Sequence, residues 1–153
     1  MSTLPLREAA RAVILDADQR ILLLRYDENG GFWATPGGSL EPGEDYPTAA
    51  LRELGEELGA KDVFLSGEIA ERRQEHPVGG RRVQQIEKYF LVRASSDALD
   101  ASRATQTDNI RASRWWPLDE LRSTTETVYP PGLVDVVADV LTKGLPREPA
   151  LLH

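Results

Sequence analysis

The stretch GSLEPGEDYPTAALRELGEELGA, residues 38–60, holds the clearest secondary-structure signal in the chain. Asp45 is a favourable N-cap, and Pro47 falls in the first helical turn, where its missing backbone N–H costs nothing. The residues that follow continue the helical pattern, and Gly59 is placed to end it in the left-handed conformation that glycine accepts. We therefore predict a helix that starts after Asp45, has Pro47 in its first turn and continues from Thr48 to Leu58.

Three glutamates of this helix, Glu53, Glu56 and Glu57, stand at positions i, i+3 and i+4 and share one face. Like charges this close destabilise an exposed helix by roughly a few tenths of a kcal/mol per pair. Arg52 supplies only one positive charge nearby. The helix alone is compatible with two interpretations, a solvated acidic face or a site where a divalent cation neutralises the cluster.

The bulk composition limits the chemistry that the chain can carry. Its 153 residues suit a single domain, and its net charge of −7 argues against a general nucleic-acid binder. The absence of cysteine excludes disulfides, thiolate nucleophiles and thiolate metal sites. Two histidines, His76 and His153, are too few for a histidine-based zinc site. A metal site here must use oxygen ligands, which favour Mg²⁺, Mn²⁺ or Ca²⁺.

The rest of the chain predicts one mixed α/β domain over residues 1–153, with a loosely held tail from about residue 145. The amino terminus lacks the apolar core of a signal peptide, and no apolar run approaches the ~20 residues that span a bilayer. We expect a cytoplasmic protein without a membrane partner. Patterning predicts strands at 9–15, 21–25, 32–35, 63–71 and 83–92, a polar turn at 76–80, a loop at 97–109, a strand ending at Trp115-Trp116, and helices at 118–122 and 133–143.

The frame around the three glutamates is far more specific than the glutamates themselves. It matches the pattern G-x5-E-x7-R-E-U-x-E-E-x-G-U, in which U is a bulky aliphatic residue. Seven identities at roughly 7% usage each give a chance on the order of 1 in 10⁸ per starting point. The matching positions are Gly38, Glu44, Arg52, Glu53, Leu54, Glu56, Glu57 and Gly59.

This pattern resembles the signature box of the Nudix hydrolase family, with Ala60 as the single departure from its last aliphatic position. The Trp-x-x-Pro-Gly-Gly sequence at residues 33–38 and the Arg-Trp-Trp-Pro-Leu-Asp-Glu-Leu run at residues 114–121 are also similar to family members. The resemblance implies a Nudix-type α/β/α sandwich with a mixed β-sheet. It also implies hydrolysis of the diphosphate bond in a nucleoside diphosphate linked to another moiety, with Mg²⁺ as cofactor and Mn²⁺ as the alternative.

Carried onto this chain, the resemblance implies that Glu53, Glu56, Glu57 and the carbonyl of Gly37 hold the metal. Arg52 and Glu44 are expected to form an ion pair that orients the glutamates. Glu56 is our choice of general base. Asp108, in the loop before the tryptophan pair, or another acid is the alternative, although a loop aspartate without a catalytic role is the favoured interpretation of Asp108.

Three residues are candidates for substrate binding: Arg25, Trp33 and Gly38. A solvent-facing arginine and a buried strand tryptophan are the competing interpretations of the first two. We expect a small-molecule nucleotide as substrate, foremost a modified or ordinary nucleoside triphosphate, and no nucleic acid polymer. ADP-ribose or a nucleotide sugar is the second option. A non-catalytic nucleotide-sensing domain is disfavoured because all box carboxylates are retained. A homodimer is compatible with the sequence.

Overall fold

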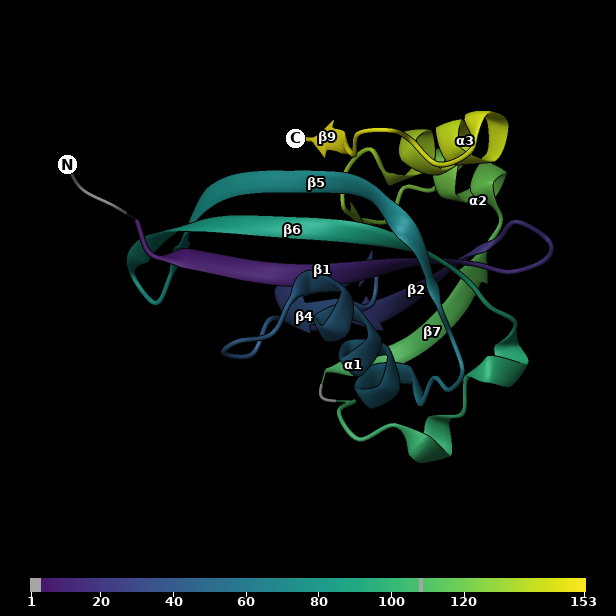
Figure 1. The fold of residues 1–153 in the computed structure, drawn as a ribbon, viewed down its shortest axis with the longest axis horizontal. Helices are drawn as coiled ribbons and strands as arrows, with labels where there is room; N and C mark the ends of the chain where they lie inside the picture. The colour runs from purple at the N-terminus through teal and green to yellow at the C-terminus, as the bar shows by residue number, and fades with distance from the viewer. Residues whose placement is uncertain (1–3, 108) are drawn as a thin grey trace.

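The computed structural model describes residues 4–107 and 109–153. A mixed β-sheet is covered by helices on both of its faces (Figure 1). One face carries α1 (Tyr46–Leu58), and the other carries α2 (Leu118–Ser123) and α3 (Leu133–Lys143). The α/β/α sandwich expected from the sequence is thereby confirmed.

Within the described residues the sheet follows the order β8-β3-β2-β1-β6-β5-β9. The β1–β6, β3–β8 and β5–β9 pairs are parallel and the other pairs are antiparallel, so the sheet is mixed. Two further strands pair outside this order, β4 with β1 and β7 with β2. The strands are β1 (Leu6–Leu15), β2 (Ile21–Tyr26), β3 (Phe32–Ala34), β4 (Gly37–Ser39), β5 (Leu65–Val78), β6 (Arg81–Arg93), β7 (Ile110–Trp116), β8 (Val128–Tyr129) and β9 (Ala150–Leu152).

The apolar residues at the C-terminal end of β1 contribute to the cores on both faces of the sheet. Val13 and Leu15 join the core beneath α2 and α3, whereas Ala12 and Ile14 join the core beneath α1. Successive side chains of a strand point to opposite faces, so one run of apolar residues fills both cores. All four side chains are at most 1% exposed.

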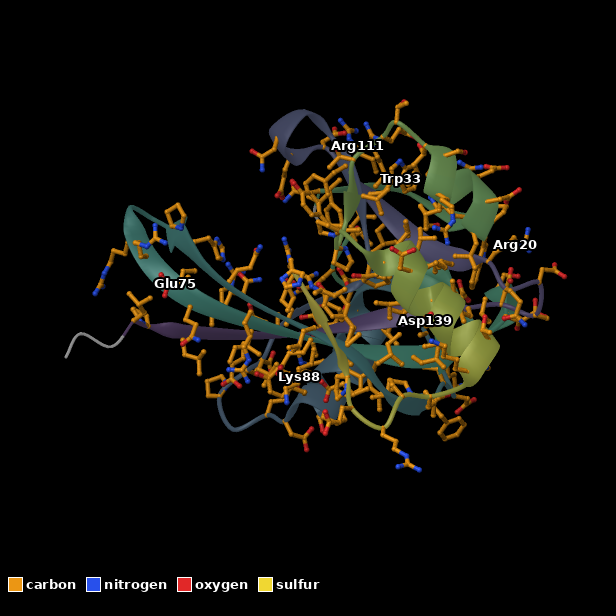
Figure 2. The ribbon with its side chains drawn as sticks, turned by 90° about the horizontal axis from the view of Figure 1, so that it is seen from above. Arg20, Trp33, Glu75, Lys88, Arg111 and Asp139 are labelled. Carbon is orange, nitrogen blue, oxygen red and sulfur yellow. The ribbon has the colours of Figure 1, made fainter. Side chains whose placement is uncertain are left out.

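One edge of β1 is shared between two strands. Leu15 pairs with Ile21 of β2, whereas the segment from Ala9 to Arg11 pairs with β4 instead. The β5–β6 hairpin therefore extends away from the part of the molecule that carries β2 and β3. Figure 2 shows this arm, labelled at Glu75, on one side and Trp33 on the other.

The β5–β6 hairpin is longer than the sequence predicts, and the expected turn at residues 76–80 is wrong. His76 and Pro77 pair with Val83 and Arg82, which leaves Gly79 and Gly80 as the turn. Both glycines have positive φ, 58° and 80°, as a two-residue hairpin turn requires. Proline is tolerated there because β9 covers β5 only further back along the strand.

Two other segments also differ from the sequence-based expectation. The expected loop at 97–109 contains short 3₁₀ helices, Ser96–Ala98 and Ala101–Arg103, and a third, Glu28–Gly30, precedes β3. The tail expected to be loosely held ends in β9, which pairs in parallel with β5. Local pattern does not reveal a three-residue strand whose partner lies far away in sequence. Among the described residues no helix is long and apolar enough to cross a bilayer.

The ends of α1 follow the local rules that predicted them. The Asp45 side chain accepts a hydrogen bond from the Thr48 backbone N–H at 2.8 Å. Gly59 ends the helix with φ 62° and donates its N–H to the Gly55 carbonyl. The helix begins at Tyr46, directly after the Asp45 N-cap, with Pro47 in its first turn as predicted.

Gly59→Ala should lower the free energy of unfolding by more than about 1 kcal/mol, because a left-handed alanine is strained. Its Cβ would also lie 1.9 Å from the Asp100 carbonyl oxygen. Gly55→Ala is the matched control: no atom lies within 4 Å of its added Cβ, and the change should raise the free energy of unfolding by roughly 0.5–1 kcal/mol. Urea unfolding measures both, and shifts of the same sign would contradict this account of the helix end.

Candidate metal and substrate site

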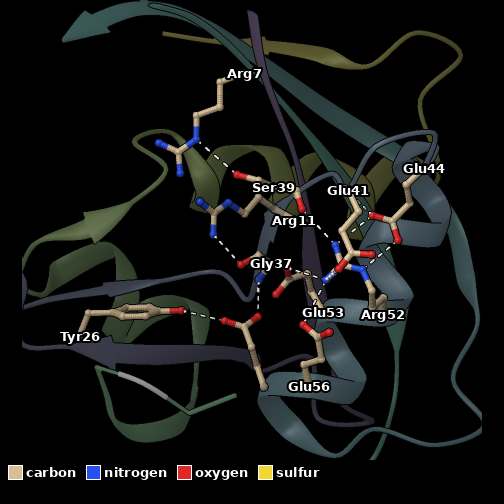
Figure 3. A network of polar contacts seen from close by, with 11 residues as sticks. Arg7, Arg11, Tyr26, Gly37, Ser39, Glu41, Glu44, Arg52, Glu53 and Glu56 are labelled. Carbon is tan, nitrogen blue, oxygen red and sulfur yellow. Dashed lines mark hydrogen bonds and ion pairs between the residues drawn. The ribbon is translucent and has the colours of Figure 1, made fainter. Parts of the chain in front are cut away.

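The Arg52 guanidinium is the centre of a polar network that joins α1 to the loop before it (Figure 3). Its Nε and Nη2 donate to the two carboxylate oxygens of Glu44 at 2.8 and 2.9 Å, a bidentate pair. Nη2 also donates to the Ser39 carbonyl at 3.0 Å, and Nη1 donates to Glu53 and Glu56, each at 3.1 Å. The structure thus brings Arg52 together with Glu44, Glu53 and Glu56.

Electrostatics at this network agree with the geometry. Hydrogen bonds from Arg52 lower the pKa of Glu44 to about 2, so its carboxylate is charged at any physiological pH. The Glu44 side chain is only 9% exposed, which favours an oriented ion pair over a loose surface contact. Arg52 is therefore fixed to the loop and in turn fixes the direction of the glutamates.

Glu57 occupies a more enclosed position, between α1 and β4. One of its carboxylate oxygens accepts from the Gly37 backbone N–H at 2.8 Å, and the other accepts from the Tyr26 hydroxyl at 3.2 Å. Burial raises the pKa of Glu57 to about 7, and burial likewise raises the pKa of Glu53. Desolvated carboxylates side by side are the environment that a divalent cation stabilises.

The backbone between β3 and α1, which includes β4, lies close to these carboxylates. A Cβ on Gly38 would lie 2.5 Å from a carboxylate oxygen of Glu53. Any side chain at this position would therefore displace the Glu53 carboxylate. The Gly37 carbonyl accepts from Arg11 Nη1 at 3.1 Å, and a carbonyl oxygen has a second lone pair for another partner. Three carboxylates and one carbonyl form a hard oxygen donor set that fits Mg²⁺ or Mn²⁺.

Among residues 4–107 and 109–153, no three acidic or histidine side chains converge as a ready-made ligand cage. Glu53 and Glu56 turn toward Arg52, and Glu57 turns toward the Gly37 N–H and Tyr26. The residues fit a divalent cation by type and position. Binding would require these carboxylates to exchange part of their present contacts for the ion.

An open cleft of about 540 Å³ adjoins Gly37, Gly38 and Glu57. It lies between the β5–β6 arm and the part of the molecule that carries β3. Its two sides differ in chemistry: β1 and β5 contribute three arginines on one side, next to Tyr89 of β6, and β2, β3 and β8 contribute three aromatic rings on the other. The arginines are Arg7, Arg11 and Arg72, and the aromatic rings are Tyr26, Phe32 and Tyr129.

Arg25 and Trp33 do not line this cleft. Arg25 Nη1 and Trp33 Nε1 both donate to the same Glu126 oxygen, at 2.9 and 3.2 Å. Trp33 is only 9% exposed and packs edge-on against Trp116. Trp33 is thus a buried strand tryptophan, whereas Arg25 is 30% exposed and ion-paired, and its contact with substrate stays a prediction. Gly38 does line the cleft, and Asp108 lies outside the described residues.

Sequence reasoning missed the residues that line the cleft from the sheet. Arg11 and Glu87 lie within strands that we expected to be ordinary core elements, and Arg72 falls just past the predicted end of its strand. A signal was present in the alternation of Arg7, Ala9 and Arg11 with period two, which places both arginines on one face. Which face is open cannot be read from the alternation.

Gly38→Ala should weaken divalent-metal binding by roughly tenfold or more, the range seen when a ligand-orienting contact is lost. The added Cβ displaces the Glu53 carboxylate, which is the end of a flexible side chain, so folding should survive. Titration with Mn²⁺ followed by electron paramagnetic resonance measures the affinity, urea unfolding checks the fold, and Gly55→Ala is the control. Unchanged Mn²⁺ affinity in Gly38→Ala would remove Glu53 from the ligand set.

Comparison with solved structures places this fold among Nudix proteins. A NUDIX hydrolase from Nitrosomonas europaea superposes with a TM-score of 0.71 at 22% identity, covering 92% of this chain and 91% of that one. A MutT protein from Methanosarcina mazei gives a TM-score of 0.63 at 21% identity, over 94% of this chain and 99% of that one. At these identities the likeness establishes the fold alone.

Sequence relatives are more similar. An RNA pyrophosphohydrolase from Rhodospirillum rubrum is 29% identical over 152 residues, covering 94% of this chain and 92% of the relative. Another from Sphingopyxis alaskensis is 32% identical over 130 residues, covering 77% and 82%. The family model described as the NUDIX domain matches residues 5–137. Since that match includes the glutamate helix, the cleft and most of the chain, the protein belongs to the Nudix family.

Proposed function

We propose that this protein is a metal-dependent pyrophosphohydrolase that acts on the triphosphate at the 5′ end of RNA. The family, and the relatives named RNA pyrophosphohydrolase, give the class of reaction. The protein is a hydrolase of phosphorus-containing anhydrides. The finer assignment, a 5′-triphosphate end, rests on those relatives and on one observation. A cleft with arginines on one side and aromatic rings on the other runs up to the glutamate helix.

The two sides of the cleft match the two parts of a nucleotide. Guanidinium groups recognise phosphate oxygens, and aromatic rings stack on bases regardless of sequence. Tyr26 and Phe32 stack with ring centroids 5.4 Å apart, and Tyr129 meets Phe32 edge-on at 5.4 Å. Because the cleft is open rather than enclosed, a chain attached to the first nucleotide has a way out.

This proposal revises the expectation that no nucleic acid polymer binds. The net charge of −7 argues against a protein that coats nucleic acid through a basic surface. An enzyme that takes only the end of a chain needs cations at that end alone. Arg7, Arg11 and Arg72 supply these cations on one side of a cleft that Glu28, Glu57 and Glu87 also line.

Glu53, Glu56 and Glu57, with the Gly37 carbonyl, would hold the divalent cation, with Mg²⁺ preferred and Mn²⁺ as the alternative. When bound, such an ion supplies charge neutralisation of the phosphates and lowers the pKa of a coordinated water. Arg52 contributes by orienting Glu53 and Glu56 from a position that Glu44 fixes. Tyr26 and the Gly37 N–H do the same for Glu57.

Glu56 remains our proposed general base, accepting the proton of the attacking water at a carboxylate oxygen. Its side chain is 24% exposed, which leaves it accessible to water, and one of its oxygens accepts from Arg52. Glu57 is the alternative within the described residues, since it lines the cleft directly. Asp108 stays a further alternative on sequence grounds.

A substrate panel tests the function: 5′-triphosphorylated RNA, nucleoside triphosphates, ADP-ribose and nucleotide sugars, each with Mg²⁺ or with EDTA. We expect metal-dependent release of phosphate or pyrophosphate, with kcat/KM highest for the RNA. Mass spectrometry of the products identifies the bond that breaks. A higher kcat/KM for free nucleoside triphosphates would return the substrate to the small-molecule class.

Glu56→Gln should lower kcat by roughly 10²–10⁴-fold, the contribution typical of a general base. Glu75→Gln, on the β5–β6 arm with a side chain 56% exposed, is the control and should leave kcat unchanged. Should Glu57→Gln lose kcat to that extent while Glu56→Gln retains it, Glu57 takes the role of base.

A further inference from the structure

The sheet side of the cleft contains an arginine pair that shares a single carboxylate. Arg11 Nε donates to Glu87 at 3.0 Å, and Arg72 Nη1 lies 3.7 Å from the other oxygen of Glu87. These side chains are only 24%, 14% and 9% exposed for Arg11, Arg72 and Glu87. Two cations and one anion therefore leave one buried positive charge without a counterion in this group.

The placement of these residues follows from strand register. Arg72 of β5 pairs with Glu87 of β6, which pairs in parallel with Ala9 of β1. Arg11 lies two residues beyond Ala9, on the same face. Further back on this face, Val13 and Leu91 are covered by α3. The face thus changes from apolar core to charged cleft floor where the helices stop covering it.

Arg72 also carries an unused donor. Among the residues that the structure describes, its Nε–H is buried and has no hydrogen-bond partner. A buried donor without an acceptor is costly, more so on a charged group, and native proteins rarely retain one without a ligand or water to satisfy it. The loose 3.7 Å contact to Glu87 does not satisfy this atom.

The charge that faces this group from neighbouring elements is mixed. Arg7, further along β1, adds positive charge toward the outer end of the cleft, beside the neutral Gln85 and Gln74. Glu57 lies at the inner end, where it is turned toward the Gly37 N–H and Tyr26. Burial alone would lower the pKa of Arg11, but Glu87 more than offsets this, so that pKa is raised and Arg11 stays charged.

We propose that Arg72, with Arg11 and Arg7, forms an anion subsite on the cleft floor that binds a phosphoryl group of the substrate. Glu87 holds the two inner arginines in position, and the guanidinium of Arg72, whose Nε–H has no acceptor among the described residues, donates to a phosphate oxygen. That the phosphoryl group belongs to the substrate rests on the proposed function. The anion-binding property itself rests only on the arginines, their burial and the unused donor.

The binding test uses inorganic pyrophosphate in the presence of EDTA, measured by isothermal titration calorimetry. The protein has a net charge of −7, so affinity for this anion without metal must come from a local cationic site. We expect Arg72→Met to weaken pyrophosphate binding by roughly tenfold, the effect of losing one charge-assisted hydrogen bond. Arg73→Met is the matched control: the adjacent arginine of the same strand is 56% exposed and pairs with Glu71, and its removal should leave affinity unchanged.

Kinetics supply a second readout. If Arg72 binds the phosphoryl group equally in ground and transition states, Arg72→Met raises KM for 5′-triphosphorylated RNA and leaves kcat unchanged. Arg72→Lys retains the charge and lacks the Nε–H, so it should fall between wild type and Arg72→Met in both measurements. It also replaces Arg72→Met if urea unfolding shows that the methionine variant does not fold.

The possible outcomes separate the subsite from the proposed function. If the wild type binds no pyrophosphate in EDTA, if Arg72→Met binds it as tightly as wild type, or if Arg73→Met loses as much affinity, the subsite is overturned. If pyrophosphate binding depends on Arg72 while RNA is not hydrolysed, the subsite stands and the RNA proposal fails. A fall in kcat alone, with pyrophosphate affinity unchanged, assigns Arg72 a structural role and overturns the subsite.

Discussion

The backbone of Gly37 passes so close to β1 that no side chain fits there. A Cβ at this position would lie 2.2 Å from the Ala10 carbonyl oxygen, and its φ of 145° lies in the region that favours glycine. The approach lets one peptide serve two neighbours, since its N–H binds Glu57 and its carbonyl accepts from Arg11. The glutamate helix and the arginine floor of the cleft are joined through this residue.

Groups of opposite charge lie on the two sides of Gly37. On one side of Gly37 the glutamates of α1 gather around Arg52, and on the other side Arg11 and Arg72 gather around Glu87. Arg52 orients the glutamates in the first group, and Glu87 orients the two arginines in the second. A metal ion and a phosphate carry the charges that these two groups lack, so a metal-bound phosphate chain is complementary to both at once.

The sequence predicted correctly the elements that depend on neighbouring residues. It failed for elements whose extent depends on partners far away in the chain. The caps of α1, the apolar runs of β1 and β2, and the helix at 133–143 all follow from neighbours within a few residues. The turn at 76–80 was wrong because polar residues were taken to end a strand, whereas pairing with β6 carries β5 to Val78. Trp33 had two open interpretations, and its burial against Trp116, a residue 83 positions away, favours the buried strand tryptophan.

The sequence by itself determined which glutamates share one face of α1 and which signature residues surround them. Spacing along a helix fixes which side chains are neighbours, so Glu53, Glu56, Glu57 and Arg52 can be placed together without knowledge of the fold. The tertiary structure alone decided the cleft. Arg11, Arg72 and Glu87 come from three strands, and their meeting depends on the β1–β6 and β5–β6 registers. A shift of one residue in either register would turn a side chain to the opposite face, and no local pattern specifies that choice.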